Sequence, residues 1–211
     1  MRLTALLAAL CVSLSAPAVM AKDVQTAVFA GGCFWCVESD MDEINGVLST
    51  TSGFTGGSVA NPSYKDVTKG GTGHRESVQV SFDADVIAYE DLARRFLRTV
   101  DVTDAGGQFC DRGLQYSTAI FATTPEQATV AQDLVNEAAS ELGTDVATVV
   151  ELAGPFYEAD GYHQDYHTQK SIILTRFGPL TKATAYKKYR NACGRDARVK
   201  EVWGAAAYAG S

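Results

Sequence analysis

The chain has 211 residues, with 25 acidic and 18 basic side chains and a formal net charge of -7. Its length is that of a single domain, large enough to bury its own hydrophobic core. An acidic chain lacks the basic patch that the phosphates of nucleic acids require, so we expect no nucleic-acid partner.

The first 21 residues have the pattern of an export signal. Arg2 supplies a positive start, residues 3–19 are mostly apolar, and the small residue Ala21 offers a cleavage site. Two serines and a proline interrupt the apolar run, which favours removal over retention in a membrane. We therefore expect export to a periplasm-like compartment, no stable membrane association, and one folded domain over residues 22–211 with a loose C-terminal segment.

The start of this domain predicts a strand, a tight turn and a helix. Residues 26–30 are β-branched, aromatic and apolar, as in a buried strand, and two glycines then precede a helix predicted over residues 34–44. Cys33 is expected at the helix N-terminus, where free N–H groups and the helix dipole favour a thiolate. Phe34 and Trp35 form an apolar pocket beside the sulfur, which indicates a reactive cysteine rather than an ordinary buried one.

Strands and helices alternate along the rest of the chain. In order, we predict a strand at 47–54, a loop at 61–64, a strand at 76–82, a helix at 85–100, a glycine-rich connection at 104–113, a strand at 117–122, a helix at 125–142, a strand at 145–152, a loop at 156–169 and a helix at 183–203. Thr124 and Pro125 suit the N-cap and first residue of the 125–142 helix. This alternation predicts an α/β (α+β) fold, a two-layer sandwich with a mixed central sheet.

Several polar side chains lie in loops or at strand ends. Tyr64 and Tyr116 can donate hydrogen bonds to a developing oxyanion. Glu76 opens a strand among apolar residues, where desolvation raises the pKa of its carboxyl and keeps it protonated as an acid. Asp111 is placed to orient a tyrosine or a water, and a further polar cluster comprises His163, Gln164, Asp165 and Tyr166. Each has an ordinary structural explanation, so their occurrence together with Cys33 is what indicates a site.

Four cysteines follow the export signal: Cys33, Cys36, Cys110 and Cys193. Two structural disulfides are one explanation in an exported protein, although a domain of this length needs no such staples. Cys33 and Cys36 also have the spacing of zinc ligands. No second Cys-x-x-Cys or His-x₃-His pair follows, so we expect no metal.

Short motifs along the domain resemble those of the A-type peptide methionine sulfoxide reductases. They include Gly31-Gly32-Cys33-Phe34-Trp35, Asn61-Pro62-Ser63-Tyr64, Gly73-His74-Arg75-Glu76, Gly107-Gln108-Phe109-Cys110-Asp111-Arg112-Gly113-Leu114-Gln115-Tyr116 and Tyr162-His163-Gln164-Asp165-Tyr166. The resemblance spans residues 24–203. It departs at Ser117 and Thr118, where relatives often have a basic residue, and at Cys36, where many have glycine. The expected fold is a ferredoxin-like core with long loops.

The resemblance implies a thiol-dependent reductase that converts methionine S-sulfoxide, protein-bound or free, to methionine. Cys33 would attack the sulfoxide sulfur and become a sulfenic acid, while Glu76 would protonate the oxygen. Tyr64, Tyr116 and Asp111 complete the implied catalytic set. The implied substrate-binding residues are Phe34, Trp35, His163, Asp165 and Tyr166. No cofactor is required, since a thioredoxin-like protein would reduce the resulting disulfide.

The thiol that resolves the sulfenic acid on Cys33 is left open between Cys36 and Cys193. Cys36 lies one helical turn away, at a Cα separation of about 5 Å that permits a disulfide. Cys193 lies near a C-terminal segment expected to be mobile, from which many relatives resolve, whereas Cys110 is expected to be held in place beside Asp111. We favour Cys36, because local closure needs no large motion, with a relay to Cys193 as a further step.

Three other functions fit parts of the sequence. A thiol-disulfide oxidoreductase would use Cys33 and Cys36, but it leaves Glu76 and the tyrosines without a role. A Cys-His hydrolase would use His74 or His163 as its base. An exported binding module would grip a peptide with the aromatic loops.

Overall fold

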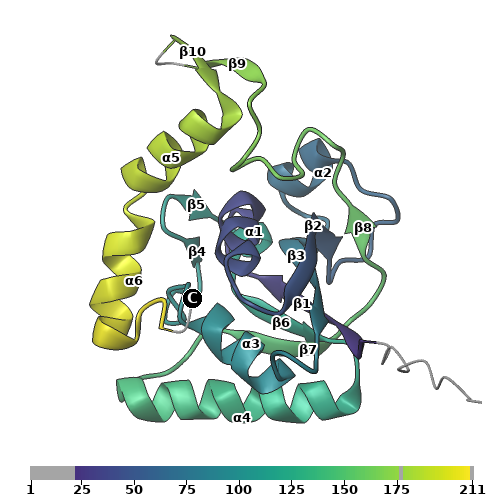
Figure 1. The fold of residues 1–211 in the computed structure, drawn as a ribbon, viewed down its shortest axis with the longest axis vertical. Helices are drawn as coiled ribbons and strands as arrows, with labels where there is room; N and C mark the ends of the chain where they lie inside the picture. Colours follow the sequence, from purple (N-terminus) through teal and green to yellow (C-terminus); the bar gives the residue numbers. More distant parts are fainter. Residues whose placement is uncertain (1–21, 176–177, 210–211) are drawn as a thin grey trace, which may run out of the picture.

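The computed structural model describes residues 22–175 and 178–209, so the predicted export signal lies outside the described residues. A six-stranded sheet with the strand order β7-β6-β1-β3-β2-β8 forms its centre (Figure 1). The strands are β1 (Val24–Ala30), β2 (Val47–Thr55), β3 (Arg75–Asp83), β6 (Ala119–Ala122), β7 (Val149–Leu152) and β8 (Tyr157–Glu158). Only β6 and β7 pair in parallel within this sheet, so it is mixed, as the sequence predicts.

The central unit is β1-α1-β2-β3-α3-β6, with helices α1 (Phe34–Asp42) and α3 (Tyr89–Leu97). Its strand order, β6-β1-β3-β2, is the ferredoxin-like arrangement, which confirms the expected core. Helix α4 (Pro125–Leu142) begins at the predicted N-cap, since Thr124 accepts a hydrogen bond from the N–H of Gln127. The main core lies between these helices and one face of the sheet, where Phe29 of β1 stacks on Phe96 of α3 at 4.6 Å.

Two elements in the first half differ from their predicted form. Helix α3 is shorter than the predicted 85–100 helix because Ile87 is buried in a turn before it and the Thr99 hydroxyl donates to the carbonyl of Phe96 at its end. Helix α2 (Tyr64–Lys69) follows the predicted loop at 61–64 and was not predicted. Ser63 and Asp66 form a capping box at its start, a signal that the sequence does contain.

The C-terminal region differs more from its prediction. A hairpin of β9 (Ile172–Thr175) and β10 (Gly178–Thr181) precedes helices α5 (Lys182–Ala192) and α6 (Arg195–Trp203), which lie along one side of the molecule (Figure 1). The predicted single helix is broken at Gly194, whose φ of +68° lies in the left-handed region. The expected loose segment instead contains η2 (Gly204–Ala206), and beyond it Tyr208 donates its N–H to the carbonyl of Arg98 at 3.1 Å. The segment is therefore docked on the core, at least to residue 209.

Three short elements complete the fold near the end of β1. The strands β4 (Gly107–Gln108) and β5 (Asp111–Arg112) form a small hairpin, and η1 (Leu114–Tyr116) follows it. These elements bring two predicted site residues, Asp111 and Tyr116, toward the N-terminus of α1. In the part of the chain that the structure describes, no helix is long and apolar enough to span a membrane.

Candidate active site

Cys33 lies where the sequence predicts it, between the end of β1 and the first turn of α1. It occupies the N-cap position of α1 and is 7% exposed. The turn before it requires both glycines. A side chain at Gly31 would meet Val100 at 2.7 Å, and Gly32 has a φ of +88° with Gln108 only 2.6 Å from where its Cβ would be. The chain can therefore present Cys33 at this point only with a Gly-Gly turn.

Glu76 lies beside Cys33, near the start of β3, and is 1% exposed. Its Oε2 accepts the N–H of Phe34 at 3.1 Å, and the Tyr116 hydroxyl also hydrogen-bonds this carboxyl. Burial outweighs these hydrogen bonds and raises the pKa of Glu76 to about 8. The carboxyl is thus protonated at neutral pH, as expected from the apolar surroundings of Glu76 in the sequence.

The predicted thiolate at Cys33 does not agree with the electrostatics of the free site. Burial raises the pKa of Cys33 well above its ordinary value, and the interaction with Cys36 raises it further. The N–H of Phe34, one of the free N–H groups expected at the start of α1, donates to Glu76. In the substrate-free site Cys33 is therefore a protonated thiol.

Cys36, the second thiol of the motif, lies one turn along α1 and is also buried. The hydrogen bond from Cys33 lowers the pKa of Cys36, and the guanidinium groups of Arg195 and Arg190 lower it further. Arg195 is fully buried and donates to the carbonyls of Gly31 and Thr99 at 3.1 and 3.0 Å. Sequence reasoning missed both arginines because they come from helices about 160 positions later, with no local motif to mark them.

An aromatic wall surrounds the thiols and includes four of the five residues predicted to bind substrate. Trp35 stacks on Tyr166 at 3.7 Å between ring centroids, and His163 lies 5.3 Å from Phe34. Tyr64 joins this group, with its ring 4.2 Å from His163. The structure therefore brings these predicted residues together.

The fifth predicted substrate-binding residue, Asp165, lies apart. It is exposed in a turn, with a φ of +52°, and its carbonyl accepts the N–H groups of Thr168 and Gln169. Its neighbour Gln164 holds the loop in place instead, through hydrogen bonds of 2.8 Å to both the N–H and the carbonyl of Ser52 on β2. The position of Asp165 thus favours a role in shaping the loop over contact with substrate.

Asp111 is positioned by a residue that the sequence did not single out. The Tyr189 hydroxyl, from α5, donates to Oδ2 of Asp111. Burial raises the pKa of Asp111, while this hydrogen bond opposes the rise. The prediction that Asp111 would pair with a tyrosine or a water is consistent with this contact, but nothing in the sequence indicates a partner 78 positions away.

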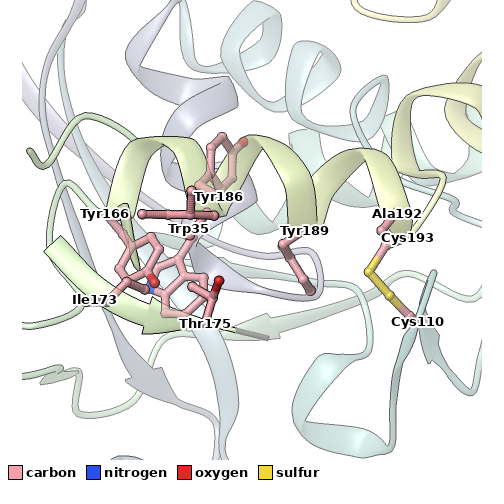
Figure 2. Close-up of a pocket in the computed structure, with 11 residues that line it drawn as sticks. Trp35, Cys110, Tyr166, Ile173, Thr175, Tyr186, Tyr189, Ala192 and Cys193 are labelled. Carbon is pink, nitrogen blue, oxygen red and sulfur yellow. A yellow bond between two sulfur atoms is a disulfide. The ribbon is translucent and has the colours of Figure 1, made fainter. Parts of the chain in front are cut away.

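The two remaining cysteines form a disulfide. Cys110, in the β4–β5 turn, is bonded to Cys193 at the C-terminal end of α5, with their Cα atoms 5.2 Å apart (Figure 2). In the sequence analysis, Cys110 and Cys193 were each considered separately as the thiol that could form a disulfide with Cys33. In this structure the pair is closed, Cys33 and Cys36 are free thiols, and Cys193 is not available to attack either of them.

The two histidines of the hydrolase hypothesis do not provide a base for Cys33. Nδ1 of His74 accepts the N–H of Gly57 at 3.1 Å, and Nε2 donates to the carbonyl of Val59 at 2.7 Å. His163 lies against the faces of Tyr64 and Trp35, and burial lowers its pKa. Among the described residues, no group of three or more histidine, cysteine or acidic side chains is arranged to hold a metal ion.

Comparisons with known proteins agree on one family. A family model described as "Peptide methionine sulfoxide reductase" matches residues 25–204. The chain is 48% identical over 190 residues to peptide methionine sulfoxide reductase MsrA 2 of Rhizobium meliloti, covering 90% of this chain and 89% of that relative.

Solved structures of the same kind share its fold. Methionine sulfoxide reductase A of Corynebacterium diphtheriae is 32% identical, with a TM-score of 0.65, over 68% of this chain and 73% of that one. The reduced form of Mxr1 from Saccharomyces cerevisiae is 30% identical, with a TM-score of 0.65, over 68% and 83% of the two chains. The family match extends over the full set of site residues, from Cys33 to Arg195.

Proposed function

Because this chain belongs to the peptide methionine sulfoxide reductase family, it reduces methionine sulfoxide to methionine, and we propose that Cys33 is the thiol that attacks the sulfoxide sulfur. The observation that carries this assignment is the carboxyl of Glu76, buried beside Cys33. It is bound to the N–H of Phe34, the residue that follows Cys33. An acid in this position supplies the proton that the sulfoxide oxygen needs as its bond to sulfur breaks.

The first step transfers oxygen from the substrate to Cys33. The thiol loses its proton as its sulfur attacks, and methionine then leaves, so that Cys33 is oxidised by two electrons to a sulfenic acid. Glu76 protonates the oxygen. Burial raises the pKa of both Tyr64 and Tyr116, so these phenols remain protonated and donate hydrogen bonds to the same atom.

Cys36 resolves the sulfenic acid in the second step. Its sulfur attacks the sulfur of Cys33 and displaces the oxygen as water, which leaves a Cys33–Cys36 disulfide. The support for Cys36 is its hydrogen bond from Cys33, its lowered pKa beside Arg195, and the closed state of the Cys110–Cys193 pair. Relay of the disulfide to Cys193 would first require reduction of that pair.

One turnover without reductant tests this order of events. We expect peptide mapping after one equivalent of substrate to show a new Cys33–Cys36 disulfide and an unchanged Cys110–Cys193 disulfide. The mapped protein before addition of substrate is the control. A Cys33–Cys193 bond with Cys36 still free would contradict the assignment of Cys36.

A thioredoxin-like dithiol protein completes the cycle by reducing the Cys33–Cys36 disulfide through thiol exchange. The substrate is the S epimer, either in oxidised proteins or as the free amino acid, since each epimer has its own enzyme type. A peptide with one methionine sulfoxide and dithiothreitol tests the reaction itself. We expect the peptide to lose the mass of one oxygen. Insulin reduction, ester cleavage or binding without turnover would support the three rival functions instead.

The N-terminal sequence supports repair of exported proteins. Arg2, the apolar run over residues 3–19 and the small residue Ala21 are the pattern on which this proposal rests. We expect the exported form, when expressed from the full sequence, to begin at Lys22 in N-terminal sequencing. An intact Met1 on protein in the membrane fraction would show an anchor, and an intact Met1 in the cytosol would show that there is no export.

A further inference from the structure

A pocket of about 420 Å³ lies between α5, the β9–β10 hairpin and the first turn of α1. Figure 2 shows its aromatic wall, in which Trp35 and Tyr166 lie below Tyr186 of α5 and Tyr189 lies farther along the same helix, toward Cys193. Ile173 of β9 closes one side, and the Cys110–Cys193 disulfide lies at the far end of α5. Its volume is within the range typical of pockets that bind small organic molecules.

This pocket shares part of its wall with the buried cluster that holds the reactive thiols. Cys33 and Cys36 belong to one buried cluster with Tyr166 and Tyr186, and Trp35 packs against that cluster. The indole of Trp35 is thus shared by the thiol site and the pocket. A polypeptide whose sulfoxide lies at Cys33 therefore has a neighbouring residue within reach of the pocket.

The lining determines which kind of group the pocket accepts. Aromatic and aliphatic side chains dominate it, and the polar tip of Tyr189 is already engaged by Asp111. Among the described residues, no charged side chain lines the pocket. A buried charge without a partner is costly, whereas an apolar side chain gains free energy by leaving water.

We propose that this pocket is a subsite for the apolar side chain of a residue that flanks the oxidised methionine in a polypeptide substrate. The inference rests on the proposed function, because it takes Cys33 as the point where the sulfoxide binds. Free methionine sulfoxide has no flanking side chain and leaves the subsite empty. Aromatic and large aliphatic neighbours are therefore the favoured sequence context in oxidised proteins.

Matched peptides test the preference directly. Short peptides carry one methionine S-sulfoxide with phenylalanine, serine or aspartate immediately before or after it, and N-acetyl methionine sulfoxide is the reference without a neighbour. With dithiothreitol as reductant, we expect kcat/KM to be about tenfold or more higher for phenylalanine than for serine in at least one of the two positions. The difference should reside in KM, since the subsite binds substrate without touching the reacting atoms.

Filling the pocket tests its location. Ala185 and Ala192 of α5 line the pocket, whereas Ala197 of α6 is exposed and lies outside it. We expect Ala185→Trp and Ala192→Trp to remove most of the preference for phenylalanine, with a much smaller effect on N-acetyl methionine sulfoxide. The control Ala197→Trp should retain the preference. Two filling variants are used because one of them can fail to fold.

Several results would overturn the subsite. One is an equal kcat/KM for the phenylalanine and serine peptides at both positions. Another is a filling variant that folds and still prefers the phenylalanine peptide as strongly as the parent does. If the filling variants slow only turnover with a thioredoxin-like protein and leave the peptide preference intact, the pocket binds the reductant and the proposal is wrong. Failure of the parent protein to reduce N-acetyl methionine sulfoxide would instead count against the proposed function.

Discussion

Replacing Cys33 with serine is expected to abolish reduction of methionine sulfoxide. A hydroxyl is far less nucleophilic toward sulfur than a thiol and cannot carry the oxygen as a sulfenic acid. We expect the rate of methionine formation to fall by more than about a thousandfold, in line with the contribution of covalent catalysis. The fold should persist, since serine nearly matches cysteine in size. Serine is also a favoured residue at the N-cap of a helix, the position that Cys33 occupies in α1.

The matched control is Cys36→Ser, which removes the other free thiol of the same motif. This variant should still form about one methionine per protein molecule in a single turnover and then stop, with the sulfenic acid on Cys33 open to trapping by dimedone. Circular dichroism and thermal melting check the fold of both variants. Residual activity of Cys33→Ser above about a thousandth of the parent would contradict the role of Cys33.

The local patterns of the sequence were sufficient for the core of the fold. The strand, Gly-Gly turn and helix around Cys33 are encoded within one continuous segment, residues 24–42. The start of α4 is marked by its N-cap residue Thr124 and by Pro125 after it. The division between α5 and α6 was not predicted, since a glycine within a helical pattern does not by itself reveal that its φ becomes positive. The β9–β10 hairpin lacks a clear alternation of polar and apolar residues in its sequence, and in the structure it contacts α5.

Site residues were predictable where a motif surrounds them, and not where tertiary contacts alone define their role. Glu76 follows from its apolar strand, and its raised pKa results from the same burial. Tyr189 and Arg195 act on Asp111 and Cys36 across long sequence separations, so only the folded chain shows them. The expected Cys33 thiolate was wrong for a related reason, because helix position favours the charge but burial beside Cys36 opposes it.

Replacing Glu76 with glutamine tests the proton donor. The amide can still hydrogen-bond the sulfoxide oxygen but cannot protonate it, so the single-turnover rate should fall by about 10²–10⁴-fold. Glu38→Gln is the control, because Glu38 is equally buried but faces His167 at 3.9 Å rather than the thiols. It should keep a rate near that of the parent. Unchanged kinetics in Glu76→Gln would remove Glu76 from the role of acid.

The protonation state of Glu76 can also be measured without turnover. Its carboxyl has a pKa of about 8 in the folded protein against an ordinary value of 4.5, so it is neutral at pH 7 and ionises as the pH rises through about 8. We expect the infrared carbonyl band of a protonated acid to disappear over that range, and to be absent at pH 7 in Glu76→Gln.

The stability of the fold should depend on pH for the same reason. Between pH 4.5 and 8 the unfolded chain releases the proton of Glu76 while the folded chain keeps it, so the parent should lose stability relative to Glu76→Gln as the pH rises. Above about pH 8 both states are ionised and the difference should become constant. A stability difference independent of pH would mean that Glu76 is already ionised in the folded protein and cannot supply the proton.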